Sequence, residues 1–455
     1  MSFAAFLVYV LLSFFRPIEL FAPELGEYRP MLWLWSLAFA FALGRALIRK
    51  EMACRPLHLG LLAALCAAVA ISQVAAGWAG GAVKALSDFS PSVMLFVLVI
   101  LNVTSIPRLH ATCAVLVISM VLAAGMSINA YHTGTYAPDL VLRQNTGGLD
   151  EESERAADVS AKQAATMVPA KDKSGWFLWR IRGMGFLNDP NDFAQAIVMV
   201  SPLLWGAWVQ GRKLRNLFVV ILPGGLLAYA LVLTQSRGAI VGVGAMLFFG
   251  VRRRLGTTKT TVLLVLLLAV AVIGNMVGGR GFSTQERSAE ERIEAWQVGI
   301  QLLRARPLTG AGFGNFIDHN YLTAHNSFVL CFAELGLIGY FVWLALIVIA
   351  YKGLSLSVEQ LPTNSSERKM AALLRSSLVG FLACAWFLSR TYAPGLYFAL
   401  ALCVSTWWIA QRSLPDEPAR SGLAVVHWRR DTGVLLVASI LAIYGFILVH
   451  RLSIG

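Results

Sequence analysis

The sequence predicts an all-α polytopic membrane protein with about 12–13 transmembrane helices, organised as a single integral membrane domain over residues 1–455. Of these 455 residues 57% are hydrophobic and only 14% are charged, against about 25% charged in a typical soluble domain. The mean hydropathy is +0.66. The net charge of +13 does not indicate nucleic-acid binding, because most basic residues fall in short loops between apolar runs, as in membrane proteins with cytoplasmic basic loops.

Apolar runs that can span a bilayer, or nearly so, recur along the whole chain; a span needs about 20 such residues. Basic loops alternate with less basic ones at every crossing, which predicts a cytoplasmic N-terminus. The first run has no basic stretch before it and no clear cleavage site, so we expect it to be a retained helix. The runs cover residues 3–15, 31–48, 57–76, 89–104, 108–129, 192–209, 214–233, 237–251, 260–277, 325–350, 370–389, 394–411 and 432–450.

Two large loops, 130–191 and 278–324, fall on the outer side in this topology and are therefore predicted to be periplasmic. In the second loop, four apolar residues recur at helical spacing and predict an amphipathic helix that ends at Pro307. These residues are Ile293, Trp296, Ile300 and Leu303.

Neither the cysteines nor the acidic residues form a convincing metal site. The six cysteines show no CxxC or Cys/His spacing typical of zinc. The segment Asn188–Asp192 resembles an acidic metal site, but it also reads as a helix start, with Asp189 as N-cap and Pro190 at the first position. We favour the helix start and predict no metal and no cofactor.

Arg237 is the first candidate functional residue. It stands in Thr-Gln-Ser-Arg-Gly at the outer end of a short apolar run, where the positive-inside bias disfavours a basic residue. Charges at membrane depth are costly and indicate function by default. The alternative is an arginine that anchors the helix at the interface.

Further arginines on the outer side could bind an anion together with Arg237. Guanidinium groups bind phosphate through two parallel hydrogen bonds and stay charged at any working pH. Arg292, Arg287 and Arg280 lie in or before the amphipathic helix, and Arg182 ends a basic, aromatic stretch of the first loop. A polar loop carries charges in any case, so these residues could equally be solvated.

His325 is predicted to begin a membrane helix, beside Asn326. A neutral imidazole can accept a proton from a hydroxyl, and the positive end of the helix dipole disfavours the protonated ring. His319, six residues upstream, is a rival, and a purely local capping role is the alternative. Glu334 is a carboxylate inside the same apolar run, where it could orient Arg237 or His325.

The Gly310–Gly314 segment, Gly-Ala-Gly-Phe-Gly, has glycines at the spacing of a phosphate-binding loop. It follows no predicted strand and lacks the GxxxxGK pattern. A tight turn before the membrane helix is therefore the favoured interpretation.

In their order and spacing, these motifs resemble the O-antigen ligase superfamily of bacterial inner-membrane glycosyltransferases. The resemblance covers about residues 230–345, and the helices outside this range match only in hydropathy. The matching pieces are Ser236-Arg237-Gly238, Arg292-x-x-x-Trp296, the stretch from Arg306 to Gly314, His325-Asn326-Ser-Phe and Glu334-Leu-Gly336-Leu-Ile-Gly339, with Pro190-Asn191-Asp192-Phe-Ala upstream.

The resemblance implies a C-type glycosyltransferase fold and transfer of a glycan from an undecaprenyl-diphosphate carrier at the periplasmic face. It implies that His325 activates the acceptor hydroxyl and that Arg237 and Arg292 bind the diphosphate. Arg280, Arg287, Arg182 and Glu334 are further candidates for substrate binding. No metal is implied, and arginines alone can stabilise the charge that develops on a diphosphate leaving group.

Several acceptors remain open at this point, and lipid A–core is the favoured one. Lipid A–core would make the protein an O-antigen ligase of lipopolysaccharide biosynthesis, a second lipid-linked glycan would make it a polymerase, and a protein hydroxyl would make it an O-oligosaccharyltransferase. A polysaccharide transporter is the alternative from another class. It is disfavoured because the sequence shows no paired, broken inverted repeats.

Overall fold

The computed structural model describes residues 2–49, 52–145, 177–262, 282–414 and 427–454 of the chain. Helices dominate these residues, and the described strands form one short antiparallel pair. The predicted all-α membrane architecture is confirmed. Every predicted apolar run coincides with a helix except 260–277, most of which lies outside the described residues.

Seven helical segments among the described residues are long and apolar enough to cross a membrane, judged by length and composition. Two shorter apolar helices, Ser2–Phe15 and Arg237–Gly250, fall below that length. The seven segments are Pro30–Ile48, Pro56–Ala75, Gly81–Asn102, Ile106–Thr133, Lys213–Thr234, Ser327–Gln360 and Trp428–Leu452.

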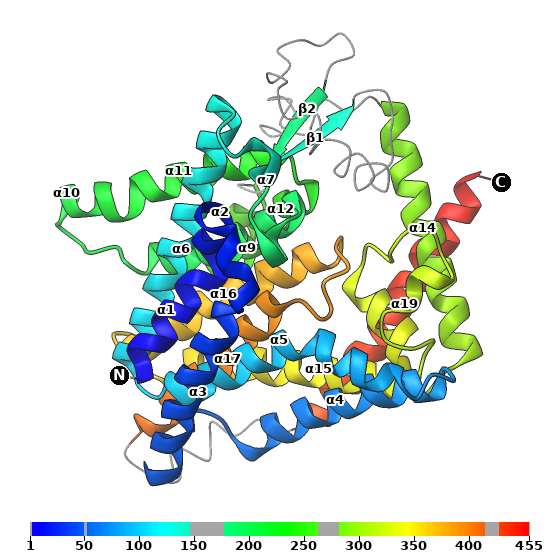
Figure 1. The fold of residues 1–455 in the computed structure, drawn as a ribbon, viewed down its shortest axis with the longest axis horizontal. Helices are drawn as coiled ribbons and strands as arrows, with labels where there is room; N and C mark the ends of the chain where they lie inside the picture. Colours follow the sequence, from blue (N-terminus) through cyan, green and yellow to red (C-terminus); the bar gives the residue numbers. More distant parts are fainter. Residues whose placement is uncertain (1, 50–51, 146–176, 263–281, 415–426, 455) are drawn as a thin grey trace. The chain divides into compact units, whose positions relative to one another are not determined.

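The chain forms two compact units, each built from separate stretches of sequence. The first unit comprises residues 1–49, 107–284 and 379–384. Its elements are α1 (Ser2–Phe15), α2 (Pro17–Phe21), η1 (Pro23–Tyr28), α3 (Pro30–Arg49), α6 (Ile106–Thr133), α7 (Ala137–Leu140), β1 (Val141–Asn145), β2 (Phe177–Ile181), η2 (Gly185–Leu187), α9 (Pro190–Trp205), α10 (Lys213–Asn216), η3 (Leu217–Ile221), α11 (Leu222–Thr234) and α12 (Arg237–Leu255), drawn in Figure 1.

Small residues allow close helix packing inside the first unit. A Cβ on Gly242 of α12 would lie 2.3 Å from the Cys384 sulfur and 3.0 Å from the Gly380 carbonyl oxygen. Gly380 and Cys384 belong to α16 (Ser366–Ala385), which runs through both units. Gln195 of α9 adds a hydrogen bond from its side-chain nitrogen to the Phe381 carbonyl, at 3.0 Å. Small residues at helix contacts are the usual means of close approach in membranes.

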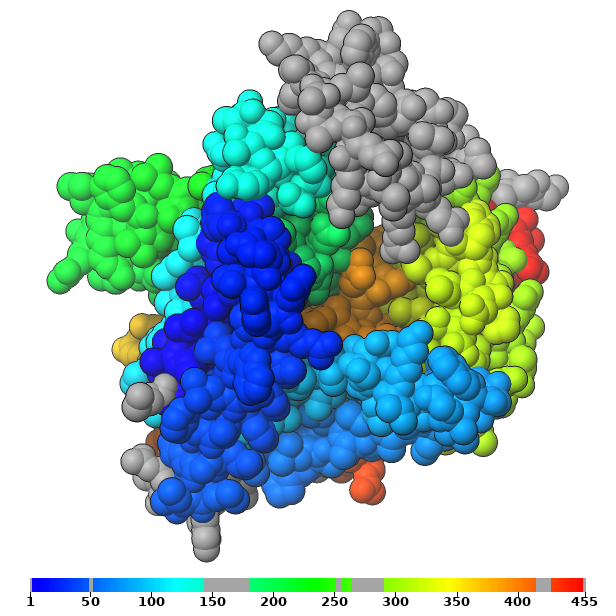
Figure 2. Space-filling model, in the orientation of Figure 1, coloured from blue at the N-terminus to red at the C-terminus, as the bar shows by residue number. Residues whose placement is uncertain are grey.

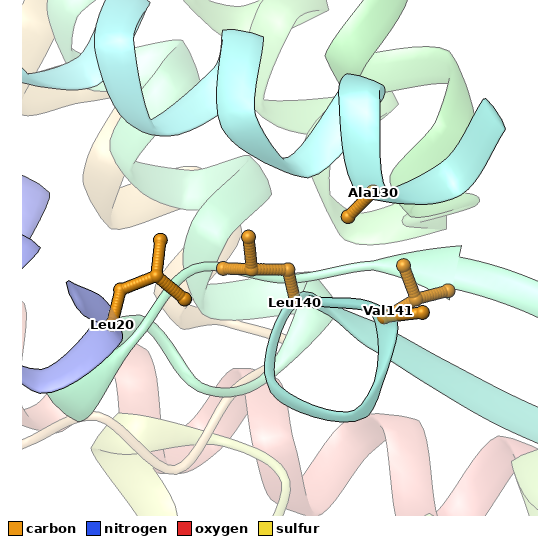
Figure 3. Close-up of a cluster of buried hydrophobic side chains, with 5 residues drawn as sticks. Leu20, Ala130, Leu140 and Val141 are labelled. Atoms are coloured by element: carbon orange, nitrogen blue, oxygen red, sulfur yellow. The ribbon is translucent and has the colours of Figure 1, made fainter. Parts of the chain in front are cut away.

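The first predicted loop contains a β-hairpin that the sequence analysis did not predict. β1 pairs with β2 in antiparallel register, with Val141 opposite Ile181. Its base is covered by a small apolar cluster from four elements, shown in Figure 3. The cluster comprises Leu20 of α2, Ala130 of α6, Ala137 and Leu140 of α7, and Val141 of β1.

The helical segment from α10 to α11 carries an apolar, exposed surface and projects from the first unit (Figure 2). Leu214 and Phe218 are 74% and 60% exposed. Exposed leucine and phenylalanine along a helix of this hydropathy suit contact with lipid chains rather than water.

The second unit comprises residues 50–106, 285–378 and 385–455. At its centre lies α15, whose apolar window is 72% buried, against 44% or less in the other six segments. Figure 1 shows α14 beside α19 and α4 beside α15. Besides the first part of α16, the elements are α4 (Pro56–Ala75), α5 (Gly81–Asn102), α14 (Phe282–Ala305), η4 (Phe316–Asp318), α15 (Ser327–Gln360), α17 (Pro394–Arg412) and α19 (Trp428–Ile454).

The predicted amphipathic helix of the second loop is α14, and its apolar face is buried. Ile293, Trp296, Ile300 and Leu303 are all at most 9% exposed. The helix ends at Ala305, two residues before Pro307, because proline cannot donate the next helical hydrogen bond.

Candidate active site

His325 lies in the connection between α14 and α15 and has a left-handed backbone, with φ of 45°. The expectation that it begins the helix was wrong by two residues, since α15 starts at Ser327. Asn326 is the N-cap, and its Oδ1 accepts the N–H groups of Phe328 at 2.9 Å and Val329 at 3.2 Å. Asparagine is a strong N-cap because its side chain satisfies these N–H groups. A left-handed non-glycine residue is strained by about 1–3 kcal/mol, and such residues cluster at active sites.

The Arg292–Trp296 motif is attached directly to the segment that carries His325. The Trp296 indole Nε1 donates to the carbonyl of Ala324 at 3.0 Å. One turn further on, a Cβ at Gly299 would lie 2.4 Å from Val329, so α14 packs tightly on the first turn of α15. Residues four apart share a helix face, so Arg292 continues this face one turn before Trp296. The structure therefore brings the helix face of Arg292 to the His325 segment.

The connection between α16 and α17, residues 386–393, forms hydrogen bonds with the residues on either side of His325. Arg390 N–H donates to Ser327 Oγ at 2.8 Å, and Thr391 Oγ1 donates to the Ser327 carbonyl at 2.6 Å. Ser389 Oγ donates to Thr323 Oγ1 at 3.0 Å. His325 thus lies between residues 323 and 327, both of which are fixed to this connection.

The Gly-rich turn packs against a break in α15 at Gly336, where φ is +63° and ψ is −168°. A broken membrane helix is tolerated when other groups satisfy the freed backbone, and here the turn does so. The four hydrogen bonds run from Ala311 N to Ala333 O (2.8 Å), Gly312 N to Glu334 O (3.0 Å), Leu337 N to Pro307 O (2.8 Å) and Ile338 N to Leu308 O (3.4 Å). The tight-turn interpretation is confirmed, and two of the turn's N–H groups are used by α15.

Glu334 lies in α15 at the level of this turn and is 2% exposed. Its Oε1 accepts the Phe316 N–H at 3.3 Å, and its carboxyl group faces the buried Tyr392 hydroxyl. Burial, followed by the charge of Glu334, raises the pKa of Tyr392 well above its ordinary value. These contacts join the turn to the connection that holds Ser327.

Arg237 is the first residue of α12 in the first unit, and Ser236 is the N-cap, with its side chain accepting Ala239 N–H. The residue before the cap, Gln235, has a left-handed backbone with φ of 51°. The Arg237 side chain is half-buried. The Ser-Arg-Gly motif is therefore a capped helix start that fixes the backbone of Arg237.

Two buried arginines, Arg180 of β2 and Arg182 just after the strand, support this part of the first unit, and only Arg182 was predicted from the sequence. Arg180 Nε donates to Thr234 O at 2.9 Å, and its Nη2 donates to Asn191 Oδ1 at 3.0 Å. Arg182 donates from Nη2 to Pro138 O at 2.9 Å and from Nε to Asp139 O at 3.2 Å. The sequence signal for Arg180 was its spacing of two from Arg182, because residues two apart in an extended segment point to the same side.

The Asn188–Asp192 segment is a helix start, as favoured from the sequence. Asp189 is the N-cap of α9 and accepts the N–H groups of Asn191 and Asp192, with Pro190 at the first position. Within the described ranges, no three His, Cys, Asp or Glu residues come together as metal ligands.

The remaining candidate residues are not placed beside His325 by any described contact. Arg280 lies outside the described residues, and of Arg287 only the backbone, within α14, is described. His319 is exposed and follows η4. Arg237 and Arg182 belong to the first unit, whereas Arg292, His325 and Glu334 belong to the second.

Replacing Trp296 by phenylalanine tests whether α14 positions His325. The ring is kept and one hydrogen bond to Ala324 is lost, so we expect a loss of about 1 kcal/mol in the free energy of unfolding. Misplacement of a reacting group costs more in rate, up to about 10²-fold, so kcat should fall with little change in KM. Trp33→Phe, at an exposed position of α3, is the control. An unchanged kcat in Trp296→Phe would remove the positioning role.

Comparison with known proteins supports the resemblance over the part of the chain that holds these motifs. Residues 218–344 match the protein family described as O-Antigen ligase. This range includes Arg237, Arg292, His325 and Glu334. A comparison with curated proteins found no match. Residues 218–344 are therefore similar to the O-antigen ligase family, as their motifs predicted.

Proposed function

We propose that this protein transfers a glycan from an undecaprenyl-diphosphate carrier to a hydroxyl of lipid A–core, at the periplasmic face of the bacterial inner membrane. The family match supports glycan transfer within the O-antigen ligase and polymerase superfamily. The observation that carries the assignment of a base is the position of His325, a strained residue held between the Trp296–Ala324 hydrogen bond and the Asn326 cap.

In the proposed reaction, the His325 imidazole accepts the proton of the acceptor hydroxyl while the hydroxyl oxygen attacks the anomeric carbon. The bond from that carbon to the diphosphate oxygen breaks, and the diphosphate leaves with the electron pair. In-line attack inverts the anomeric centre. General base catalysis of this kind contributes about 10²–10⁴-fold.

Arginines are proposed to stabilise the departing diphosphate. Arg292 is assigned this role because α14 brings its helix face to the His325 segment. Arg237 is assigned it from its motif, Ser236-Arg237-Gly238, at a capped helix start. Fixed guanidinium groups aimed at developing charge lower the barrier without reorganising during the reaction. Arg182 is better explained as a support for α7, given its hydrogen bonds to the Pro138 and Asp139 carbonyls of that helix.

Replacing Arg237 by lysine should lower kcat/KM by about tenfold to a hundredfold. The charge is kept, but lysine cannot offer the planar pair of donors that matches phosphate oxygens. Arg252→Lys, at the other end of α12, is the control, because Arg252 stacks on Phe249 with its Cζ 4.6 Å from the ring centroid. Equal transfer rates in wild type and Arg237→Lys would argue against a bidentate diphosphate contact.

A reconstituted assay tests the function itself. Purified protein in lipid vesicles is given an undecaprenyl-diphosphate glycan with lipid A–core as acceptor, and separately with excess lipid-linked glycan alone, in the presence of a chelator. Glycosylated lipid A–core is the expected product, and its formation with chelator present would also show that no metal is required. A ladder of lengthened carrier-linked glycan would identify a polymerase instead. No product with either acceptor would redirect the search to a protein hydroxyl or to transport.

A further inference from the structure

The amide nitrogen of the Asn326 side chain is a buried hydrogen-bond donor that has no acceptor among the described residues. Its Oδ1 accepts two backbone N–H groups of α15, so the positions of oxygen and nitrogen in the amide are fixed. Its Nδ2 is buried and has no hydrogen-bond partner among the described residues, and the residue is 0% exposed. An unsatisfied buried donor is costly in a folded protein, and an incoming acceptor oxygen would remove that cost.

The backbone of Arg390, in the connection between α16 and α17, contacts the residue that follows Asn326. Its backbone N–H donates to Ser327 Oγ, on the residue that follows Asn326, at 2.8 Å. The neighbouring side chain of Ser389 is bonded to Thr323, two residues before His325. The connection is therefore attached on both sides of His325, and the Arg390 side chain is half-buried there.

The charge of Arg390 is unusual for its place in the chain. The predicted topology puts the short connection at residues 386–393 on the outer side, where the positive-inside bias disfavours arginine. Arg237 is likewise an arginine on the predicted outer side. The N-terminal end of α15 adds the positive end of the helical stretch that precedes the break at Gly336, which further favours a bound anion.

We propose that Arg390 and the Asn326 amide nitrogen bind a phosphate oxygen of a substrate beside His325. This inference rests on the proposed function and adds two binding residues to that site. The phosphate belongs either to the diphosphate of the donor or to a phosphorylated acceptor such as lipid A. Arg390 supplies a charged fork for phosphate oxygens, and Asn326 supplies one neutral N–H donor.

The test uses two variants that keep the local fold. Arg390→Gln removes the charge and keeps polar character, and the backbone N–H to Ser327 remains. Asn326→Ser keeps an oxygen able to cap α15 but removes the NH₂ donor. Arg304→Gln is the matched control, because Arg304 is exposed on α14 with its Cζ 5.9 Å from the Tyr444 ring centroid. Thermal unfolding of each variant in detergent checks that the fold is retained.

Binding is measured without turnover, with full-length protein in nanodiscs and two separate probes, undecaprenyl diphosphate and lipid A. We expect Arg390→Gln to weaken one of the two by about tenfold or more and Asn326→Ser to weaken the same one by about tenfold, relative to Arg304→Gln. The affected probe identifies the source of the phosphate. Arg390→Gln binding both probes as tightly as Arg304→Gln would overturn the proposal, and unchanged binding by Asn326→Ser would remove that residue from it.

The binding and transfer assays separate this inference from the proposed function. A wild-type protein that binds undecaprenyl diphosphate through Arg390 and Asn326 but forms no product would keep the phosphate site and refute the transfer reaction. A protein that transfers glycan normally, with binding unaffected by either substitution, would keep the reaction and refute this site.

Discussion

Replacing His325 by alanine is expected to lower the rate of glycan transfer by at least about 10²-fold, the smaller end of the usual contribution of a general base. The variant should still fold, because the cap of α15 is Asn326 and the anchor to α14 is the Ala324 carbonyl, neither of which is altered. Alanine also has a left-handed backbone only under strain, so a small loss of stability accompanies the change. The measurement is kcat in the reconstituted assay, with donor and acceptor saturating.

His319→Ala is the matched control for this prediction. His319 is six residues away in the same loop, is exposed and follows the short helix η4. We expect its kcat to stay within about twofold of wild type, since surface substitutions away from special features have small effects. A large loss in His319→Ala together with normal transfer by His325→Ala would exchange the roles of the two histidines.

The second large effect is expected at Gly310, where alanine should destabilise the protein by roughly 2–6 kcal/mol. Gly310 has φ of +69°, and a Cβ there would lie 2.3 Å from the Glu334 carbonyl carbon and 2.4 Å from its oxygen. Both atoms belong to the backbone beside the break in α15, so no flexible side chain can move aside. We expect a lower midpoint of thermal unfolding and loss of monodisperse protein in detergent.

Gly314→Ala separates crowding from backbone strain. Gly314 also has a left-handed backbone, with φ of +77°, but a Cβ added there would have no neighbouring heavy atom within 4 Å. It should lose only the strain component, about 1–3 kcal/mol. If the two alanine variants unfolded at the same temperature, the contact between the turn and α15 would not contribute as described.

The sequence was most informative where a pattern repeats along one element. The apolar spacing in 293–303 predicted the amphipathic helix α14, and Pro307 predicted its end; both are confirmed, and the apolar face is buried. Cap chemistry was equally local, so Asp189 and Pro190 predicted the start of α9. At His325 the same reasoning missed by two residues, because both His325 and Asn326 could start a helix and only the backbone shows which one caps it.

Features that depend on contacts between distant segments were missed. The break in α15 at Gly336 is invisible in an apolar run, since its freed backbone groups are satisfied by residues 307–312, more than twenty positions upstream. The β1–β2 hairpin was missed because its strands are short and widely separated along the chain. Arg390 has the same outer-side charge that selected Arg237, but it was not selected because nothing in its own neighbourhood links it to His325.

By itself, the sequence determined the membrane class, the approximate positions of the long apolar helices and the family resemblance of residues 218–344, because hydropathy, helix periodicity and motif spacing are properties of neighbouring residues. The tertiary structure alone decided which groups surround His325: the Trp296 indole fixes Ala324, Asn326 caps α15, and the connection from α16 to α17 bonds to Ser327. Those partners lie up to about 60 residues apart in the chain, and only the packing of the helices selects such long-range contacts from the many that local patterns allow.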